Sequence, residues 1–285
     1  MFTTILASLL LQLMLAATFM GLRKLWRWIK ARRETDPRRK LPPLSPEQKL
    51  AMRRARIKVR EEYLDTLSIS WYQIVIVFVV SSVIGLILEE TWMYFTANRT
   101  ESRVGLVWGP FSPIYGFGAV FFTLISFCLR RKDPSMSLVF LVSAVMGGLL
   151  EQVTGMGMEY ILHAESWTYE YLPDCITKYV AWRFLLFWGL MGIVWYRVVM
   201  PNLLFFIGTP TTRRSIVFVG LLALYLSLDI FMTLAVFNRM VWRSEGVPAQ
   251  GRFEAYLDNN YSDTWIKDRF QNLVVETAPR KTEEA

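Results

Sequence analysis

Long apolar runs separated by short charged segments dominate the pattern along this chain. A helix needs about 20 mostly apolar residues to cross a bilayer. Six runs reach that length, at residues 2–22, 71–95, 104–129, 138–162, 182–200 and 215–237. The pattern therefore predicts an all-α fold, a polytopic membrane helix bundle of six transmembrane helices. The first run lacks a basic leading region and a small-residue cleavage site, so we expect it to be retained as an anchor.

The polar segments between these runs divide the chain into four parts. We expect an N-terminal membrane anchor at residues 1–22, a basic cytoplasmic arm with an amphipathic helix at 23–70, a five-helix membrane core at 71–237 and an amphipathic C-terminal tail at 238–285. Ser45-Pro46-Glu47 is typical of a helix start, with serine as the N-cap and proline in the first turn. Ile266, Phe270 and Leu273 fall at helical spacing and predict a short helix in the tail.

Composition and charge exclude an ordinary soluble or disordered protein. Hydrophobic residues make up 53% of the chain, and the net charge is +8. Residues 23–60 carry fifteen cations and three carboxylates, a local charge of +12, so the rest of the chain sums to −4. This arm either lies on anionic lipid or only sets the topology. A basic segment next to the bilayer explains the charge without nucleic acid.

The distribution of cations predicts the orientation. Lysine and arginine accumulate in short loops on the cytoplasmic side. If the six helices alternate, the basic arm, the 130–132 cluster and the 213–214 pair all lie on one side, whereas the 163–181 segment is acidic. We therefore expect a multi-pass protein of the cell membrane whose N- and C-termini are both extracytoplasmic.

Two sequence matches predict an internal repeat. The pattern Ser81-x-Val83-x-Gly85-x-x-Leu88-Glu89 recurs 62 residues later, ending at Glu151. The pattern Arg103-x-x-Leu106-x-Trp108-Gly109 recurs 80 residues later, from Arg183. Both copies run out and back, so we predict two parallel-repeat hairpins related by an axis along the membrane normal. The alternative is chance matching among residues common in membrane helices.

Ionisable residues inside apolar runs are candidates for function, because each is costly there unless it is paired or faces water. Glu89 and Glu151 end equivalent helices, and Arg103 and Arg183 begin the helices that return. We expect these to form a Glu/Arg cluster near the outer leaflet. Asp229 lies in the middle of the sixth run without a partner visible in the sequence. Further candidates for a substrate path are Arg99, Glu159 and Trp167.

The third run contains prolines and glycines that disfavour a continuous helix. Pro110 and Pro113 cannot donate backbone hydrogen bonds, and glycines stand on both sides of them. Irregular backbone at membrane depth is tolerated where protein or water satisfies it. We therefore predict a broken third helix that lines a cavity and includes Tyr115; the alternative is a simple kink.

These residues resemble a known family. Glu89, Asn98-Arg99 and the run Gly109-Pro110-x-x-Pro113-Ile114-Tyr115-Gly116-Phe117-Gly118 are similar to the signature of the bacterial CmpB-like ABC-transporter permeases. Glu151, Glu159, Trp167-x-Tyr169, Arg183 and Asp229 continue the resemblance, which covers about residues 71–237. Thr100 departs from it, because the family usually has glycine there. The resemblance implies a permease-like bacterial membrane protein.

Three functions are compatible with these features. In the first, a transport permease works with a separate ATPase subunit on the cytoplasmic side, since the chain has no G-x-x-x-x-G-K-[ST] motif. In the second, a membrane enzyme uses Glu89 or Glu151 as general base and Arg183 or Arg99 to bind an anionic lipid head group. In the third, the chain is a structural or regulatory scaffold.

The expected partners are the lipid bilayer, anionic lipid at residues 23–60 and the ATPase subunit, and homo-oligomerisation stays open. No metal-ligand spacing and no cofactor motif is present in the sequence, so we expect no metal and no cofactor.

Overall fold

A computed structural model describes residues 44–98, 100–162 and 164–275. The chain divides into two units, Met1–Lys58 and Val59–Ala285. Helix α2 (Pro46–Thr66) starts where the sequence predicts. Ser45 and Gln48 cap it reciprocally, with the Gln48 N–H donating to Ser45 Oγ at 3.2 Å and the Ser45 N–H donating to Gln48 Oε1 at 2.9 Å. The predicted first membrane helix, residues 2–22, and the arm up to residue 43 lie outside the described residues.

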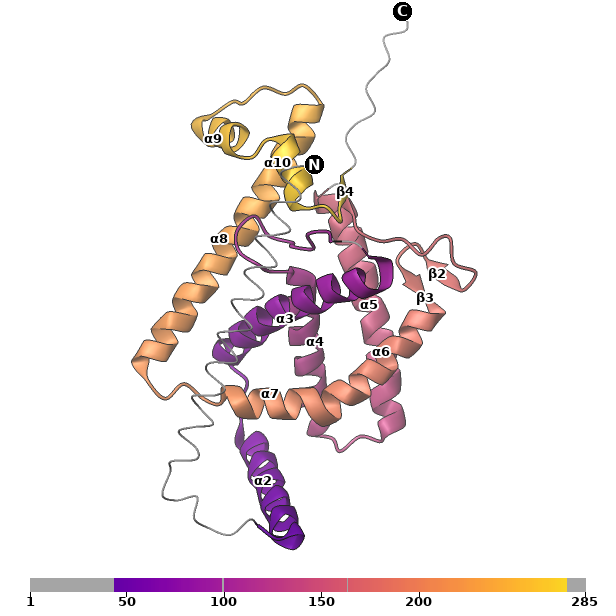
Figure 1. The fold of residues 1–285 in the computed structure, drawn as a ribbon, viewed down its shortest axis with the longest axis vertical. Helices are drawn as coiled ribbons and strands as arrows, with labels where there is room; N and C mark the ends of the chain where they lie inside the picture. Colours follow the sequence, from indigo (N-terminus) through magenta and orange to yellow (C-terminus); the bar gives the residue numbers. More distant parts are fainter. Residues whose placement is uncertain (1–43, 99, 163, 276–285) are drawn as a thin grey trace, which may run out of the picture. The chain divides into compact units, whose positions relative to one another are not determined.

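Five helices in the described part of the chain are long and apolar enough to cross a membrane. They are α3 (Trp71–Ala97), α4 (Pro113–Arg130), α5 (Met136–Leu162), the continuous run of α6 (Trp182–Val194), η2 (Trp195–Val199) and α7 (Met200–Ile207), and α8 (Arg213–Ser244) (Figure 1). In each, only 22–33% of the apolar window is buried. Most of their apolar surface therefore faces outward, as contact with lipid requires. The predicted membrane bundle is confirmed for these five helices.

The third membrane helix differs from its prediction. Residues 104–112 are not helical, and α4 begins at Pro113. Proline is well tolerated in the first turn, because its missing N–H has no partner there in any helix. Pro110 lies in the preceding loop. The prediction of a helix broken in its middle is therefore wrong, since one proline precedes the helix and the other starts it.

The membrane helices form two tightly packed hairpins, α3 with α4 and α5 with α6. In each hairpin, an aromatic ring of the second helix packs against a glycine of the first helix. A Cβ added to Gly85 would lie 2.2 Å from Cγ of Tyr115, and one added to Gly147 would lie 2.3 Å from Cγ of Trp188. The glycines are therefore needed for the close approach of the helix axes.

A second contact has the reverse arrangement, with the glycine on the returning helix. A Cβ on Gly116 would lie 2.7 Å from the Phe78 ring, and one on Gly189 would lie 2.4 Å from the Phe140 ring. In both contacts, the residue of α5 follows its counterpart in α3 by 62 positions, and the residue of α6 follows its counterpart in α4 by 73 positions. The shift of 62 is the one found in the sequence.

The shift of 80 predicted for the returning helices is wrong. It equates Trp108-Gly109 with Trp188-Gly189, but the first pair lies in the 104–112 loop and the second lies inside α6. The connection before α4, residues 98–112, is shorter than the one before α6, residues 163–181. By the shift of 73, Pro113 at the start of α4 corresponds to residue 186, whereas α6 already begins at Trp182. A match anchored on these loops therefore gave the wrong helix register.

One end of the bundle, named here the Arg130 end, gathers the ends of α2, α4 and α7. Arg130 donates to Asp65 at 2.9 Å, and Arg60 donates to Asn202 at 3.0 Å. The buried Gln73 side chain donates to the Gly208 carbonyl at 2.9 Å. A buried apolar cluster lies beneath these polar contacts, formed by Leu64, Leu67, Val77, Ala119, Phe127, Met200 and Leu204.

The other end, named here the tail end, carries short strands and the C-terminal helices. Strand β1 (Ala164–Glu165) pairs with β4 (Val274–Val275), and β2 (Cys175–Thr177) pairs with β3 (Val180–Ala181), both antiparallel. Helices α9 (Arg252–Asn260) and α10 (Asp263–Arg269) follow α8. Buried Phe237, Met240, Leu257, Ile266 and Phe270 join α8 to these helices in one apolar cluster.

Two arginines in the last turns of α8 anchor the tail. Arg239, only 2% exposed, pairs with Asp258 at 2.7 Å, and Arg243 reaches the same carboxylate at 2.7 Å. The hydrogen bond from Arg239 is the main reason that the pKa of Asp258 falls to about 2. The charged form of Asp258 is therefore the one that holds α9 in place.

Acid should release this anchor. Because the folded-state pKa of Asp258 lies below its unfolded value, its contribution to stability is complete above about pH 4. It is lost as the pH falls toward about 2. Hydrogen exchange of residues 252–269 between pH 5 and pH 2.5 should show faster opening at the acid end. In Asp258→Asn this acid dependence should be much smaller; an unchanged pH profile in that variant would contradict the assignment.

Filling the glycine contact should destabilise the second hairpin. Gly147→Ala places a methyl group against the fixed base of the Trp188 side chain, and overpacking of this kind costs about 1–3 kcal/mol. Gly157→Ala is the matched control in the same helix, because nothing lies within 4 Å of its added Cβ. The control should be neutral or stabilising by about 0.5–1 kcal/mol. Thermal unfolding of the purified variants in detergent measures both, and equal melting temperatures would contradict the close contact.

Candidate functional site

The 104–112 loop is bonded to the middle of α8 by a buried aspartate. Asp229 is 0% exposed, and its Oδ1 accepts a hydrogen bond from the Trp108 N–H at 2.8 Å. One turn further, Thr233 Oγ1 accepts from the Val107 N–H at 3.0 Å and donates to the Asp229 carbonyl at 2.8 Å. Two backbone donors that have no helical partner are thus satisfied by side chains of one helix face.

The carbonyl groups of the same loop are bonded from the tail. Arg269 of α10 donates to the Leu106 carbonyl at 3.1 Å and to the Gly109 carbonyl at 2.6 Å. Burial lowers the pKa of Arg269, and the negative charge of Asp229 opposes that change. The loop is therefore held from two sides. The carboxylate of Asp229 on α8 accepts from a loop N–H group, and the guanidinium of Arg269 on α10 donates to loop carbonyl groups.

Aromatic contacts fix the Trp108 side chain. Its indole N–H donates to the Tyr261 hydroxyl at 3.1 Å. Its ring stacks on Tyr225, with centroids 6.4 Å apart and planes 28° apart. Gly109, directly after it, has φ +70°, a conformation that glycine adopts without strain. We name the set formed by the loop, Asp229, Thr233, Arg269 and Tyr261 the Trp108 clamp.

Asp229 retains one oxygen without a partner. Its Oδ2 is buried and makes no hydrogen bond among the described residues. A buried acceptor that is left unpaired is costly, more so when it is charged. The described residues therefore leave one acceptor of the clamp unpaired, which makes Asp229 a candidate for binding a proton.

Glu89 and Arg103 come together as predicted from the sequence. Arg103 Nη1 lies 3.4 Å from Glu89 Oε1, and Arg103 Nη2 lies 3.4 Å from Glu101. Glu90 accepts from the Arg103 backbone N–H at 3.3 Å. The Tyr115 hydroxyl interacts with the Glu89 carboxylate. In this hairpin the carboxylate thus faces an arginine and a phenol.

Glu151 holds the equivalent place in the second hairpin but has no cation. It is 9% exposed, and its Oε1 accepts from the Tyr169 hydroxyl at 3.1 Å. The Trp188 indole N–H interacts with this carboxylate, although neither it nor Glu151 Oε2 has a partner within hydrogen-bond geometry among the described residues. Burial and the Glu151 charge raise the pKa of Tyr169, so this phenol stays a donor. Tyr169 also stacks on Phe184, with centroids 4.4 Å apart.

The remaining predicted residues form separate contacts around the β2–β3 hairpin. Arg183 pairs with Asp174 at 2.7 Å, and this pairing lowers the pKa of Asp174. Lys178 bridges Glu159 at 3.0 Å and Glu165 at 2.8 Å, and these bonds raise its pKa.

An aromatic contact lies beside this lysine. The Tyr179 hydroxyl also donates to Glu159, and Trp167 meets the Tyr179 ring edge-on with centroids 6.2 Å apart.

The sequence expectation of one Glu/Arg cluster is therefore wrong for the described residues. Arg183 is 51% exposed and turns back to Asp174, nine residues earlier, because the β2–β3 hairpin brings that carboxylate to the start of α6. Arg103 instead stays with the acids at the end of α3. Arg99 lies outside the described residues.

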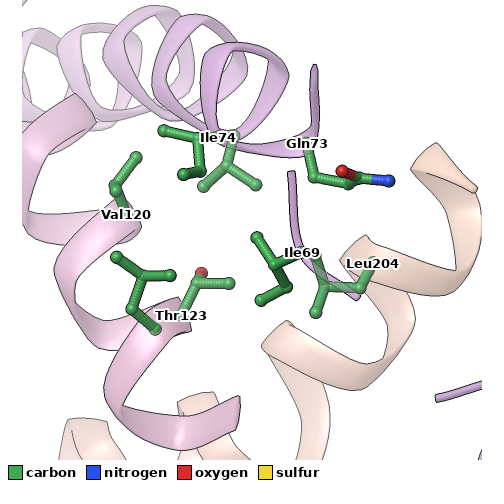
Figure 2. Close-up of a pocket in the computed structure, with 8 residues that line it drawn as sticks. Ile69, Gln73, Ile74, Val120, Thr123 and Leu204 are labelled. Carbon is green, nitrogen blue, oxygen red and sulfur yellow. The ribbon is translucent and has the colours of Figure 1, made fainter. Parts of the chain in front are cut away.

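An apolar cavity in the interior near the Arg130 end is too small for a ligand. Figure 2 shows apolar side chains from α3, α4 and α7 around a cavity of about 10 Å³. Ile69, Ile74, Val120 and Leu204 line it together with Gln73 and Thr123. This volume is at the lower limit for a single water molecule. No group of three or more His, Cys, Asp or Glu residues that could hold a metal ion occurs in the described part of the chain.

Several clamp residues were missed by sequence reasoning. Thr233 stands four residues after Asp229, on the same helix face, so its spacing was an available signal. Arg269 and Tyr261 gave none, because they lie more than 150 residues beyond the loop that they bind.

The helices and the buried acids describe a multi-pass membrane protein with charged groups inside its bundle. Residues 76–234 match the family model described as "Putative ABC-transporter type IV", the CmpB-like family. The match covers more than half of the chain, which therefore belongs to this family and to the transporter class of membrane proteins. No curated protein and no solved structure matched the chain.

Removing the Asp229 acceptor should loosen the Trp108 clamp. Asp229→Leu leaves the Trp108 N–H buried and unpaired, which costs about 1–3 kcal/mol. Asp229→Asn keeps an oxygen for that N–H and should retain most of the stability. Thermal unfolding and hydrogen exchange of the 104–112 amides compare the two variants. Equal damage in both would show that the charge facing Arg269, rather than the hydrogen bond, holds the loop.

Proposed function

We propose that this chain is the membrane-embedded permease of an ABC-type transporter whose ATP hydrolysis is supplied by a separate subunit. The family match over residues 76–234 carries this proposal. The chain contains no G-x-x-x-x-G-K-[ST] motif, so it does not itself provide this nucleotide-binding loop. The Arg130 end faces the cytoplasm in this proposal, with a sixth helix at residues 2–22 and both termini outside.

The two hairpins are duplicated copies in this proposal. The paired contacts of Gly85 with Tyr115 and of Gly147 with Trp188 support it, because the same two register shifts also relate the Phe78 and Phe140 contacts. A duplication places Glu89 and Glu151 in equivalent positions. The substrate path then runs along the tail-end halves of the hairpins, past the acids and the Trp108 clamp.

Glu151 is the acid of this path that binds the transported species or a coupling proton. It is buried, it faces a phenol and an indole rather than a cation, and one of its oxygens makes no bond among the described residues. Glu89, in contrast, has an arginine beside it, which it shares with Glu101. The α3–α4 hairpin therefore has a structural role, and the α5–α6 hairpin carries the acid that binds the transported species or the coupling proton.

The exposed loop after α4 is the docking surface for the ATPase subunit. It carries Arg131, Lys132 and Asp133, all exposed, and Asp133 has φ +42°, which fixes a tight turn. Charge reversal at such a rim position places like charges together and costs several kcal/mol in an interface. A subunit that presents acids to this loop would be repelled by a glutamate there.

Capture of the partner tests this function. The tagged chain, crosslinked in native membranes and purified, should bring down a protein with a phosphate-binding loop. Lys132→Glu should reduce the recovered amount by roughly tenfold or more. Lys267→Glu, an exposed lysine of α10 at the tail end, is the matched control and should have no effect. Reproducible absence of an ATPase from the wild-type sample would contradict the proposal.

A further inference from the structure

A charged pocket lies at the Arg130 end, away from the Trp108 clamp. Its volume is about 260 Å³, and it is lined by Arg60, Glu61, Arg130, Tyr196, Arg197 and Pro201. Pockets for drug-sized ligands have volumes of about 300–1,000 Å³. This pocket is therefore suited to a smaller polar group, such as a single head group or anion.

Three separate parts of the chain bring their cations to this pocket. Arg60 comes from the end of α2, Arg130 from the last residue of α4 and Arg197 from η2. Arg197 Nε lies 3.2 Å from Sδ of Met136, the first residue of α5. The pocket therefore lies where α4 ends and α5 begins, at the boundary of the membrane-spanning segments.

The acids around the pocket leave an excess of positive charge. Glu61 pairs with both Arg60 and Arg130, and Asp65 pairs with Arg130 at 2.9 Å. The two hydrogen bonds lower the pKa of Glu61 although burial raises it, so this acid stays charged. Among the residues that line the pocket, three arginines face one carboxylate, while Asp65 and Asp133 lie nearby. Arg197 is the lining arginine without an ion pair among the described residues.

Several donors of the residues that line the pocket have a weak partner or none among the described residues. Arg130 Nε is buried and has no partner among the described residues. Among the described residues, the hydrogen bond of the Arg197 guanidinium goes to a methionine sulfur, a weak acceptor. The Tyr196 hydroxyl interacts with both of these arginines. A planar guanidinium pair with a phenol is well suited to phosphate oxygens, which accept two parallel N–H bonds from one arginine.

We propose that this pocket binds a phosphate-bearing anion, and that the head group of an anionic phospholipid supplies it in the membrane. Basic pockets between membrane helices near the surface bind such head groups. The proposal concerns the Arg130 end alone and holds whether or not the chain transports a substrate. In it, Arg197 provides the free charge, while Arg60 and Arg130 are already oriented by Glu61.

Binding measurements on the purified full-length chain test this site. The probes are short-chain phosphatidylglycerol below its micelle concentration, inorganic phosphate, and short-chain phosphatidylcholine as the zwitterionic comparison. Arg197→Gln should raise the Kd for phosphatidylglycerol about fivefold, since one cation near the surface contributes about that factor. Because Arg197 is exposed and forms no ion pair within the described part of the chain, the variant should fold normally, and a melting curve checks this.

Arg214→Gln is the matched control, an exposed arginine at the start of α8 and outside the pocket. It should leave the Kd unchanged, and Tyr196→Phe should raise the Kd less than Arg197→Gln does. Preference for phosphatidylglycerol over inorganic phosphate supports the lipid source. Equal affinity for inorganic phosphate supports the site with a soluble anion as ligand. Equal loss in the Arg197 and Arg214 variants, or no binding of either anion, would overturn the proposal.

Discussion

Peptide groups outside a helix must find partners when they enter an apolar bundle, and the 104–112 loop meets this requirement with side chains. Asp229 and Thr233 accept its N–H groups, and Arg269 donates to its carbonyls. Much of the tail-end architecture follows from this. Helix α8 carries acceptors in its middle, and the C-terminal helices are anchored by Arg239 so that Arg269 reaches the loop. The tail is therefore part of the membrane core's hydrogen bonding.

The sequence predicted those features that a single segment determines. Apolar length gave the five described membrane helices, and Asp229 stood out because a lone acid in such a run is costly. The prolines were recognised as incompatible with a continuous helix, but their position could not be decided. A proline is compatible both with the first turn of a helix and with a kink inside one. The chain adopts the first arrangement because of the hydrogen-bond partners of the loop, which are distant in sequence.

Contacts that depend on the path of a connecting segment could not be predicted. The shift of 62 residues was found because the matched residues lie within two continuous helices, α3 and α5, and the same shift relates their glycine and phenylalanine contacts. The returning helices were misaligned, because the matched Trp-Gly pair lies in the 104–112 loop of the first hairpin but inside α6 in the second. Arg183 was assigned to the wrong acid for a related reason, since the β2–β3 hairpin brings Asp174 close to it. Such errors come from loops, whose geometry depends on tertiary packing rather than on local pattern.

The two hairpins have matching helix contacts, yet they differ in electrostatics. Glu89 meets an arginine, whereas Glu151 meets only a tyrosine and an indole. Matching helix contacts therefore do not carry matching charges, and exchanging the two hairpins would not preserve the electrostatics of the bundle. The glycine contacts keep each acid beside its own partners, because they leave the helices of each pair no room to rotate against each other.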